Sequence, residues 1–485
     1  ILSAGGSAAD AATAMYFTLA VTLPSRAGLG GGGSCLAFDA VSGSTQALDF
    51  AAQAPSTILP NADRPSAIPA NPRGFFALQA RHGRLQWREV VASAEQLARF
   101  GHPASRAFAL DLASVGQALL VDNGARAMFG AEGGRVVSEG EMVKELDLAA
   151  TLGLIRARGV GPFYSGQYAN NLVNAVNRAG GSLSIEALRN YTPQWRDTVR
   201  VKVGNEVAHF APPPAAASTQ AAVMLAMLIE NGSYDGNTEG GQDRLLAEVS
   251  LRAFSDRETW LNARGQATQT AQDFTAPDHI EAVMRGMRPE SRTPLAALVP
   301  APRDRHENAS ATAFSAVDSM GNAVSCVVSM NAAFGTGRVA PGTGILLAAA
   351  PSTDGRGPIG LAPMLVVNEN SREFHFAAGA SGGVAAPTAL MNVAARVLLD
   401  DQGLQAAVAA PRVHLSGDPD VTYHEPGLAA GAVATLSAAG HRLATTPVIG
   451  LVNAISCPDG LPTKPGTCAM AADPRGQGLA SGSMR

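Results

Sequence analysis

Strong charge of either sign is missing from this chain of 485 residues, whose net charge is −4 and whose pI is near 6.2. No basic patch stands out, so we expect neither a nucleic-acid partner nor attraction to an anionic membrane surface. Long hydrophobic runs are missing as well, because none reaches the roughly 18 residues of a membrane span. The four cysteines include no C-x-x-C, and no pair among the nine histidines has metal-ligand spacing. We therefore expect no metal site.

The rest of the composition is that of a globular protein. Hydrophobic residues make up 46% of the chain and charged residues 16%, which is enough apolar surface for a sizeable core. The 52 glycines and 30 prolines predict plentiful loops. The length fits one large domain or two to three ordinary ones. The sequence opens at Ile1 with no methionine and no signal peptide to interpret, which we take as the start of a fragment.

The glycine-rich stretch GLGGGGS, residues 28–34, formally matches the dinucleotide pattern G-x-G-x-x-G. That pattern needs a strand before the glycines and a helix after them. Here the order is reversed, because Ser7 and Asp10 form a capping-box pattern that opens a buried helix, and strand-like residues follow the glycines. No lysine follows for a phosphate loop either. We predict that these glycines allow close packing of backbone beneath a site.

Strands and helices follow one another in blocks along the rest of the chain. Residues 34–50 predict two short strands, and residues 56–150 are mostly helical. Residues 313–331 predict a hairpin, and further strands are expected at 363–368 and 373–378. Two sheets with helices on both outer faces would satisfy this order of elements.

The four cysteines fall into two groups. Cys35 and Cys326 lie in apolar, strand-like runs, so we expect buried thiols. Cys457 and Cys468 bracket the loop CPDGLPTKPGTC, which leaves two alternatives open. They form a small disulfide in an oxidising compartment, or they are two unpaired loop thiols.

Eight segments, in order along nearly the whole chain, carry a family resemblance. They are AGGSAADAATAMYFTLAVTLPSRAGLGGGG, LDFAAQAP, FYSGQYANNLVNAVNRAGGSLSIEALRNY, FAPPPAAASTQ, SAVDSMGNAVSCVVSMNAAFGTGRVAPGTGILL, GASGG, APRVH and ADPRGQG. Together they resemble the gamma-glutamyltransferase family of N-terminal-nucleophile hydrolases. The resemblance implies a four-layer αββα sandwich of the α/β (α+β) class, made by self-cleavage just ahead of a Thr or Ser.

The resemblance also implies how the chain is divided. Residues 1–311 would be the large-subunit-like region and residues 312–485 the small-subunit-like region of one αββα domain. The large and small fragments of the same chain would stay associated after cleavage. Together with the Cys457–Cys468 pair, the resemblance leads us to expect a periplasmic or secreted protein.

General chemistry supports such a site independently of the resemblance. A hydroxyl is a weak nucleophile until a base takes its proton, and the amine freed by cleavage has a pKa near 8. The N–H groups of Gly382 and Gly383 would stabilise the oxyanion, although a plain strand-to-helix turn has the same pattern. Ser329 and Asn331 match family positions that bond near the nucleophile, and alternate residues of one strand share a face. Solvent-facing polar groups are the alternative. Thr336 is a weaker candidate for binding substrate.

The nucleophile departs from the family pattern. An ungapped alignment on residues 315–322 places it at Ala311, which has no hydroxyl. Three explanations compete. In the first, Thr312 is the nucleophile, and a one-residue shift is absorbed before Phe314 because a slip in a strand would reverse its faces. In the second, an engineered alanine holds the precursor uncut. In the third, the chain is a natural homologue that has lost catalysis.

The substrate contacts that the resemblance implies are poorly kept. The arginine that follows DF and binds the α-carboxylate of a gamma-glutamyl group is Ala51 here, and bidentate carboxylate binding needs a guanidinium. A segment rich in Asn, Gln and Asp is AAAPST, residues 348–353, and a pair of serines is replaced by Ile359 and Gly360. Arg26 would partly substitute, unless it is an ordinary surface arginine.

The sequence thus predicts an amide hydrolase or acyltransferase. Self-cleavage would fall between Ala311 and Thr312, and Thr312 would be nucleophile and base together. The substrate would be a small-molecule amide or peptide without the usual glutamyl α-carboxylate contacts, and no metal or organic cofactor is implied. The alternative is an uncut, inactive homologue that acts as a binding protein.

Overall fold

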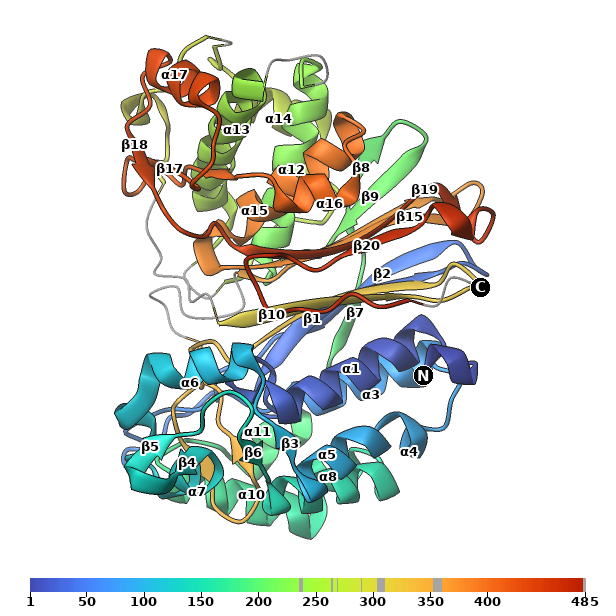
Figure 1. The fold of residues 1–485 in the computed structure, drawn as a ribbon, viewed down its shortest axis with the longest axis vertical. Coiled ribbons are helices and arrows are strands. Elements are labelled where there is room, and N and C mark those ends of the chain that lie inside the picture. The colour runs from blue at the N-terminus through green and yellow to red at the C-terminus, as the bar shows by residue number, and fades with distance from the viewer. Residues whose placement is uncertain are drawn as a thin grey trace.

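Two β-sheets lie face to face, and helices cover the outer side of each, which is the αββα sandwich expected from the sequence (Figure 1). The computed structural model describes residues 1–234, 239–262, 265–267, 269–288, 290–302, 310–351 and 360–482. In Figure 1 helices α1 to α11 lie below the two sheets, and helices α12 to α17 lie above them.

The first sheet has five strands in the order β10-β11-β1-β2-β7, and every neighbouring pair is antiparallel. Its central strand β1 begins inside the glycine-rich stretch, and β10 lies at one edge. The strands are β1 (Gly32–Asp39), β2 (Ser44–Phe50), β7 (Gln194–Arg196), β10 (Ala311–Val317) and β11 (Ala323–Ser329).

The second sheet has six strands in the order β20-β19-β15-β14-β9-β8, again antiparallel throughout. The two strands expected near residues 363–368 and 373–378 are β14 and β15. The strands are β8 (Val199–Val203), β9 (Glu206–Phe210), β14 (Ala362–Asn368), β15 (Glu373–Ser381), β19 (Leu451–Leu461) and β20 (Ala469–Ala471).

Two sets of helices cover the sheets. The first sheet packs against α1 (Ala8–Thr22) and α3 (Asn71–His82), and the second against α12 (Ala216–Asn231) and α15 (Ala386–Leu399). Helix α1 begins with the expected capping box, in which Ser7 and Asp10 bond each other's backbone N–H. No helix in the described part of the chain is both long and apolar enough to cross a membrane.

The other α-helices surround these two sets. They are α2 (Pro24–Ala27), α4 (Trp87–Val90), α5 (Ala92–Phe100), α6 (Arg106–Leu119), α7 (Asn123–Phe129), α8 (Leu146–Arg158), α9 (Gly161–Tyr164), α10 (Gly166–Arg178), α11 (Ile185–Asn190), α13 (Glu239–Trp260), α14 (Pro277–Met284), α16 (Leu404–Ala409) and α17 (Ala430–Ala438).

Both sheets combine strands from the two sides of the predicted cleavage point. In the first sheet, β1, β2 and β7 precede that point, and β11 and all of β10 except its first residue follow it, so the two parts meet between β1 and β11. In the second sheet, β8 and β9 precede it, and the two parts meet between β9 and β14. Neither part of the chain therefore contains all the strands of either of these two sheets.

All four cysteines are in disulfides, and no free cysteine remains. Cys457 and Cys468 are joined across their short loop. Cys35 and Cys326 are joined as well, which differs from the expectation of two buried thiols. The physical reason is the register of the first sheet, where Cys35 of β1 stands directly opposite Cys326 of β11. Their Cα atoms are 4.1 Å apart although 291 residues separate them in sequence.

Candidate active site

The start of β10 and the end of β15 lie at the same end of the sandwich. A Cβ on Gly379 of β15 would lie 2.8 Å from the Cβ of Ala313, so β10 crosses β15 at this point. Asn453 of β19, which pairs with Gly379, donates from Nδ2 to the Ala313 carbonyl at 3.0 Å. The far end of the β10–β11 hairpin, at Gly321, contacts Leu461, which pairs with the beginning of β15. The two strands thus run in opposite directions, and the first residues of β10 approach the last residues of β15.

A two-glycine turn, Gly382 and Gly383, follows β15 directly and leads into α15 through one 3₁₀ turn. Gly382 has φ 141° and Gly383 has φ 60°, in the region that favours glycine. A Cβ on Gly382 would lie 2.7 Å from the Cα of Gly450. The turn therefore requires glycine, and it holds two consecutive N–H groups just ahead of a helix, where the helix dipole favours negative charge. This geometry suits the predicted oxyanion hole.

Ala311 and Thr312 face opposite sides of β10. Ala311 pairs with Ser329, and Thr312 pairs with Val328. Val328 packs with Phe314 in the core beneath the helices, whereas Ala311 packs in the apolar layer between the sheets. Because successive side chains of a strand alternate, position 311 faces the second sheet and Thr312 faces the helical layer. The expected one-residue shift, which would give Thr312 the face of position 311, is therefore not present in the uncut strand.

Ser329 and Asn331 are brought together by a hydrogen bond and not by strand alternation. β11 ends at Ser329, and Asn331 lies beyond it with φ 59°, which corrects the expectation that both belong to one strand. The Ser329 hydroxyl donates to the Ser310 carbonyl at 2.9 Å and accepts from the Asn331 N–H at 2.9 Å. Asn331 Nδ2 donates to the Ala349 carbonyl at 3.0 Å. This pair fixes the residue that directly precedes β10.

The glycine-rich stretch lets backbone segments pass unusually close to one another beside this pair, as predicted. Cβ atoms on the glycines at 30–33 would lie between 2.2 and 2.5 Å from backbone atoms of neighbouring segments. For Gly31, that neighbour is the Ser329 carbonyl oxygen. The order of elements is α2, then the glycines, then β1, which is the reverse of a dinucleotide-binding turn.

The row of residues at the start of β10 continues across the sheet to Ala51. Gly32 of β1 pairs with Ser329, and the next residue, Gly33, pairs with Phe50, so Ala51 stands beside Gly32. Ala51 is buried and provides a methyl group where a carboxylate-binding site would need a guanidinium.

The polar groups around Ala51 satisfy one another. Its N–H donates to Asp49 Oδ1 at 3.0 Å, and its carbonyl accepts from the Tyr191 hydroxyl at 3.1 Å. Burial raises the pKa of Asp49, although the Ala51 N–H and Arg196 act in the opposite direction. Arg196 Nη2 lies 3.1 Å from the Asp49 carboxylate, so this arginine is already paired within the sheet.

The segment that resembles the family's head-group contacts is apolar as far as the structure describes it. Residues 348–351 are three alanines and a proline, all at least half-buried. Residues 352–353 and Ile359 lie outside the described residues. Gly360 packs on the two-glycine turn, because a Cβ there would lie 3.3 Å from the Cα of Gly383.

The other two predicted substrate-binding residues have different surroundings. Arg26 donates from Nε and Nη2 to the carboxylate of Asp111 at 2.8 and 2.6 Å, and the Ser25 hydroxyl bonds the same carboxylate. Its guanidinium is thus occupied by α6 and is not presented to a ligand. Thr336 is buried, and its Oγ1 has no hydrogen-bond partner among the described residues. Its N–H donates to the Leu347 carbonyl at 2.8 Å.

Sequence reasoning missed Asn453. Its side chain joins the two sheets, since Nδ2 bonds the Ala313 carbonyl and Oδ1 accepts from the Asp473 N–H at 3.1 Å. The surrounding residues IGLVNAI are typical of an ordinary buried strand, so nothing in the local pattern marks this asparagine. Only the pairing of β19 with β15 places it against β10.

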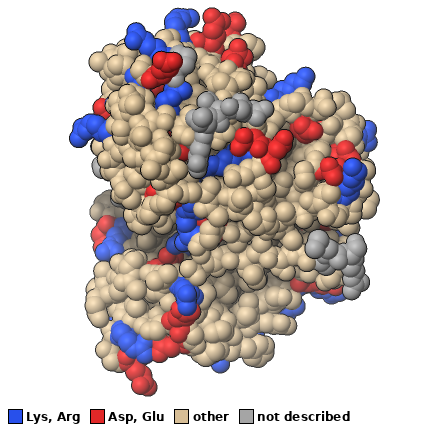
Figure 2. Space-filling view, turned by 45° about the horizontal axis from the view of Figure 1, so that its top comes forward, with Lys and Arg blue, Asp and Glu red and all other residues tan. Residues whose placement is uncertain are grey.

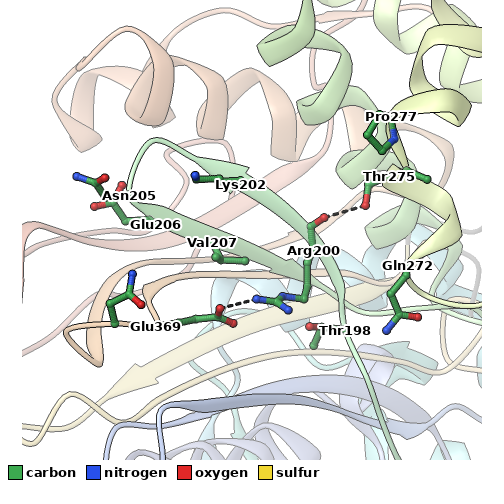
Figure 3. A pocket seen from close by; sticks show the side chains of 12 residues that line it. Thr198, Arg200, Lys202, Asn205, Glu206, Val207, Gln272, Thr275, Pro277 and Glu369 are labelled. Atoms are coloured by element: carbon green, nitrogen blue, oxygen red, sulfur yellow. Dashed lines mark hydrogen bonds and ion pairs between the residues drawn. The ribbon is translucent and has the colours of Figure 1, made fainter.

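A separate pocket of about 570 Å³ opens beside β8 and β9, at the opposite edge of the second sheet from β19 (Figure 3). In it the Arg200 guanidinium points toward Glu369 and forms an ion pair with that carboxylate. The Arg200 carbonyl accepts from the Thr275 hydroxyl at 2.8 Å. The pocket contains none of the predicted site residues. It is lined by Thr198, Arg200, Lys202, Asn205, Glu206, Val207, Gln272, Thr275, Ala276, Pro277, Glu369 and Asn370.

Charged side chains are interspersed on the face that Figure 2 shows, where blue and red groups lie scattered on a mostly tan surface. No group of three or more His, Cys, Asp or Glu side chains that could hold a metal ion occurs within the described ranges.

Comparison with known proteins extends these observations to the whole chain. A family model described as gamma-glutamyltranspeptidase matches residues 1–353 and 356–483. The chain is 28% identical to the glutathione hydrolase proenzyme of Pseudomonas aeruginosa, over 99% of this chain and 91% of that protein. It is 27% identical to the glutathione hydrolase proenzyme of Escherichia coli, over 95% and 86%. The crystal structure of cephalosporin acylase from Bacillus halodurans has the same fold, with a TM-score of 0.83 at 21% identity over 100% of this chain and 93% of that one.

Proposed function

Because the chain belongs to the gamma-glutamyltranspeptidase family, whose members are amidohydrolases of the N-terminal-nucleophile type, we propose that it hydrolyses or transfers the acyl group of a small amide or peptide. It would do so after cutting itself between Ala311 and Thr312. One observation carries the proposal. The start of β10, the Ser329–Asn331 pair and the two-glycine turn after β15 meet at one end of the sandwich.

Self-cleavage needs a hydroxyl beside the bond that breaks. The Thr312 hydroxyl would attack the carbonyl carbon of Ala311, the C–N bond would break, and the ester so formed would be hydrolysed by water. This leaves a carboxylate on Ala311 and a free α-amine on Thr312. The hydrogen bond from Ser329 to the Ser310 carbonyl supports the step, because it fixes the backbone just ahead of that bond.

Turnover would use the same hydroxyl with the new amine as its base. The amine takes the proton of the Thr312 hydroxyl, the oxygen attacks the substrate carbonyl, and the N–H groups of Gly382 and Gly383 stabilise the oxyanion. The amine then protonates the leaving nitrogen, and water or an acceptor amine releases the acyl group from the ester.

The direction of the Thr312 side chain sets a condition on this mechanism. In the uncut strand it faces the helical layer, as its partner Val328 does. After cleavage no residue precedes Thr312, so rotation about its Cα–C bond turns the amine, the side chain and the Hα together and moves the side chain into a position that the amine or the Hα held before. The mechanism requires this rotation to bring the hydroxyl to the face that Ala311 occupies before cleavage.

The substrate class follows from the recognition end of the site. Ala51 and residues 348–351 present apolar groups where a glutamyl head group would need charge. We therefore propose an amide whose acyl part is smaller or more apolar than a gamma-glutamyl group, and only weak turnover of gamma-glutamyl anilides.

N-terminal sequencing of the smaller fragment tests the nucleophile directly. We expect the fragment to begin Thr312-Ala313-Phe314, and we expect Thr312→Ala to give only the full-length chain on a reducing denaturing gel. Thr312→Ser is the matched control, because it keeps a hydroxyl on the same residue. A fragment that begins at any other residue, or continued cleavage of Thr312→Ala, would overturn the assignment.

A second candidate function is an uncut binding protein, and the face of Ala311 favours it. At position 311 a methyl group, and not a hydroxyl, lies on the face of β10 that packs against the second sheet. A single full-length band from wild type under reducing conditions, without turnover of any simple amide, is the result expected for this candidate.

We also propose an oxidising location, either periplasmic or secreted. The two disulfides support it, since such bonds persist outside the reducing cytosol. Fractionation of cells that express the natural gene would test it, and recovery in the cytosol with four free thiols would contradict it.

A further inference from the structure

The disulfide between Cys35 and Cys326 crosses the predicted cleavage point. Cys35 belongs to β1, which precedes that point, and Cys326 belongs to β11, which follows it. The bond therefore lies where the two parts of the chain meet in the first sheet. The corresponding joint in the second sheet, between β9 and β14, is made by strand pairing, and neither disulfide lies there.

We propose that the mature protein is one covalently closed unit, whose two fragments stay joined through Cys35–Cys326 after self-cleavage. The proposal rests on the proposed function only for the cleavage step. The bond itself is a property of the folded chain, so the two are tested separately below.

The place of the bond explains what it would do for the site. Cys326 also pairs with Phe314 of β10, and it lies three residues before Ser329 on the same strand. A slip of one residue between β1 and β11 would turn every side chain of one strand to the other face. The disulfide prevents that slip, and so it keeps Ser329 in register with Gly32 of β1.

The surroundings of the bond show when it would matter. Both cysteines are 0% exposed, within the core between the first sheet and α1. A reductant in solution cannot reach them while the protein is folded. The tie therefore acts when the sandwich opens, because it keeps the fragments at a high effective concentration so that they find each other again.

A denaturing gel run with and without reductant tests whether the disulfide joins the two fragments. Free thiols are first blocked with N-ethylmaleimide in denaturant. Without reductant we expect one species with the mass of the whole chain. A dithiol supplies two electrons and two protons to the bond and closes to its own disulfide, and we then expect fragments 1–311 and 312–485. Cys35→Ala with Cys326→Ala should give the two fragments without reductant.

The second disulfide provides the matched control. Cys457 and Cys468 both lie in the part after the cleavage point, so their bond cannot join the fragments. Cys457→Ala with Cys468→Ala should give the same gel as wild type. Separation of the wild-type fragments without reductant would overturn the proposal.

Peptide mapping keeps the two hypotheses distinguishable. In a tryptic digest of the blocked, unreduced protein, the peptide with Cys35 should be linked to the peptide with Cys326. Blocked thiols at these positions would show that the Cys35–Cys326 disulfide is absent, whatever the gel shows. A single band both with and without reductant overturns the cleavage, and the map then decides the disulfide alone.

Refolding kinetics give a readout that a purely local packing role would not change. After unfolding in urea without reductant, the wild-type protein should regain activity at a rate independent of protein concentration. The Cys35→Ala/Cys326→Ala protein should regain it more slowly on tenfold dilution, because its fragments must meet by diffusion. Equal dependence on concentration for both proteins would contradict the tie.

Discussion

The reaction end and the recognition end of the candidate site share one row of the first sheet through Ser329 and Ala51, but they differ in polarity. The reaction end holds Ser329, Asn331 and the two-glycine turn, with hydrogen bonds of 2.9 to 3.0 Å that fix the backbone ahead of β10. The recognition end holds Ala51, which lies two strands away from Ser329, and the alanines at 348–350. The contrast indicates that groups acting on any amide are kept, whereas groups that select a charged acyl part are absent.

The largest effect is expected at the reaction end, from Thr312→Ala. This change removes the only proposed hydroxyl, so self-cleavage should stop and turnover should fall by more than about 10³-fold. The measurement is the fraction cleaved on a reducing gel, together with the rate of amide hydrolysis. Thr312→Ser should retain cleavage. If Thr312→Ala still cleaves, the nucleophile is another residue, and the contrast between the two ends of the site no longer holds.

Ala311→Thr tests which face of β10 must carry the nucleophilic hydroxyl. Position 311 faces the second sheet beside Ser329, so a hydroxyl there would be on the face of the two-glycine turn before any rotation. We expect cleavage to move one residue earlier, to the bond between Ser310 and position 311. The first residue of the smaller fragment, read by N-terminal sequencing, distinguishes the two sites. An unchanged start at Thr312 would show that the face of position 311 does not decide where the chain is cut.

The next effect is expected from Gly382→Ala. Its Cβ would meet the Cα of Gly450 at 2.7 Å, and φ 141° strains any residue with a side chain, so the N–H groups of the turn should move. Turnover should fall by about 10²-fold, as when one oxyanion donor is lost. The control is Gly440→Ala, which has φ 92° and no atom within 4 Å of the added Cβ. Equal losses in both variants would indicate backbone strain alone.

The sequence predicted the sandwich because its motifs occur in one order along the chain, and it predicted the capping box from local chemistry alone. It did not predict what depends on the register between distant strands. Cys35 and Cys326 are 291 residues apart, and only the β1–β11 pairing makes them neighbours. The sequence did not predict the partner of Arg26 either, since Asp111 lies far away in the sequence on α6 and no motif connects the two residues.

The two disulfides show how strongly such pairing bears on stability. In the chain-entropy account, while the chain is uncut, a bond that closes a loop of 291 residues restricts the unfolded chain more than one that closes 11 residues. The difference is on the order of 3 kcal/mol at room temperature. The local sequence around either cysteine predicts neither its partner nor this difference in stability.

A smaller effect is expected from Ser329→Ala. The change removes one hydrogen bond to the Ser310 carbonyl and one from the Asn331 N–H, both close to the bond that is cut. Cleavage should slow by about tenfold, which is within the range expected for the loss of these two hydrogen bonds. Ser329→Thr should restore the rate because it keeps the hydroxyl. Rates of cleavage that match wild type in Ser329→Ala would show that this residue does not position the backbone.

The smallest effect is expected at the recognition end, from Ala51→Arg. Ala51 stands beside Gly32 in the same row as Ser329, so a guanidinium there would add the charge that this end lacks. Hydrolysis of a gamma-glutamyl anilide should rise by no more than about tenfold, through KM, because residues 348–351 still offer no polar contacts. Ala51→Lys should gain less, since an ammonium cannot bond a carboxylate with two parallel N–H groups. High anilide activity in wild type would instead mean that another cation already serves this end, and the contrast between the two ends would disappear.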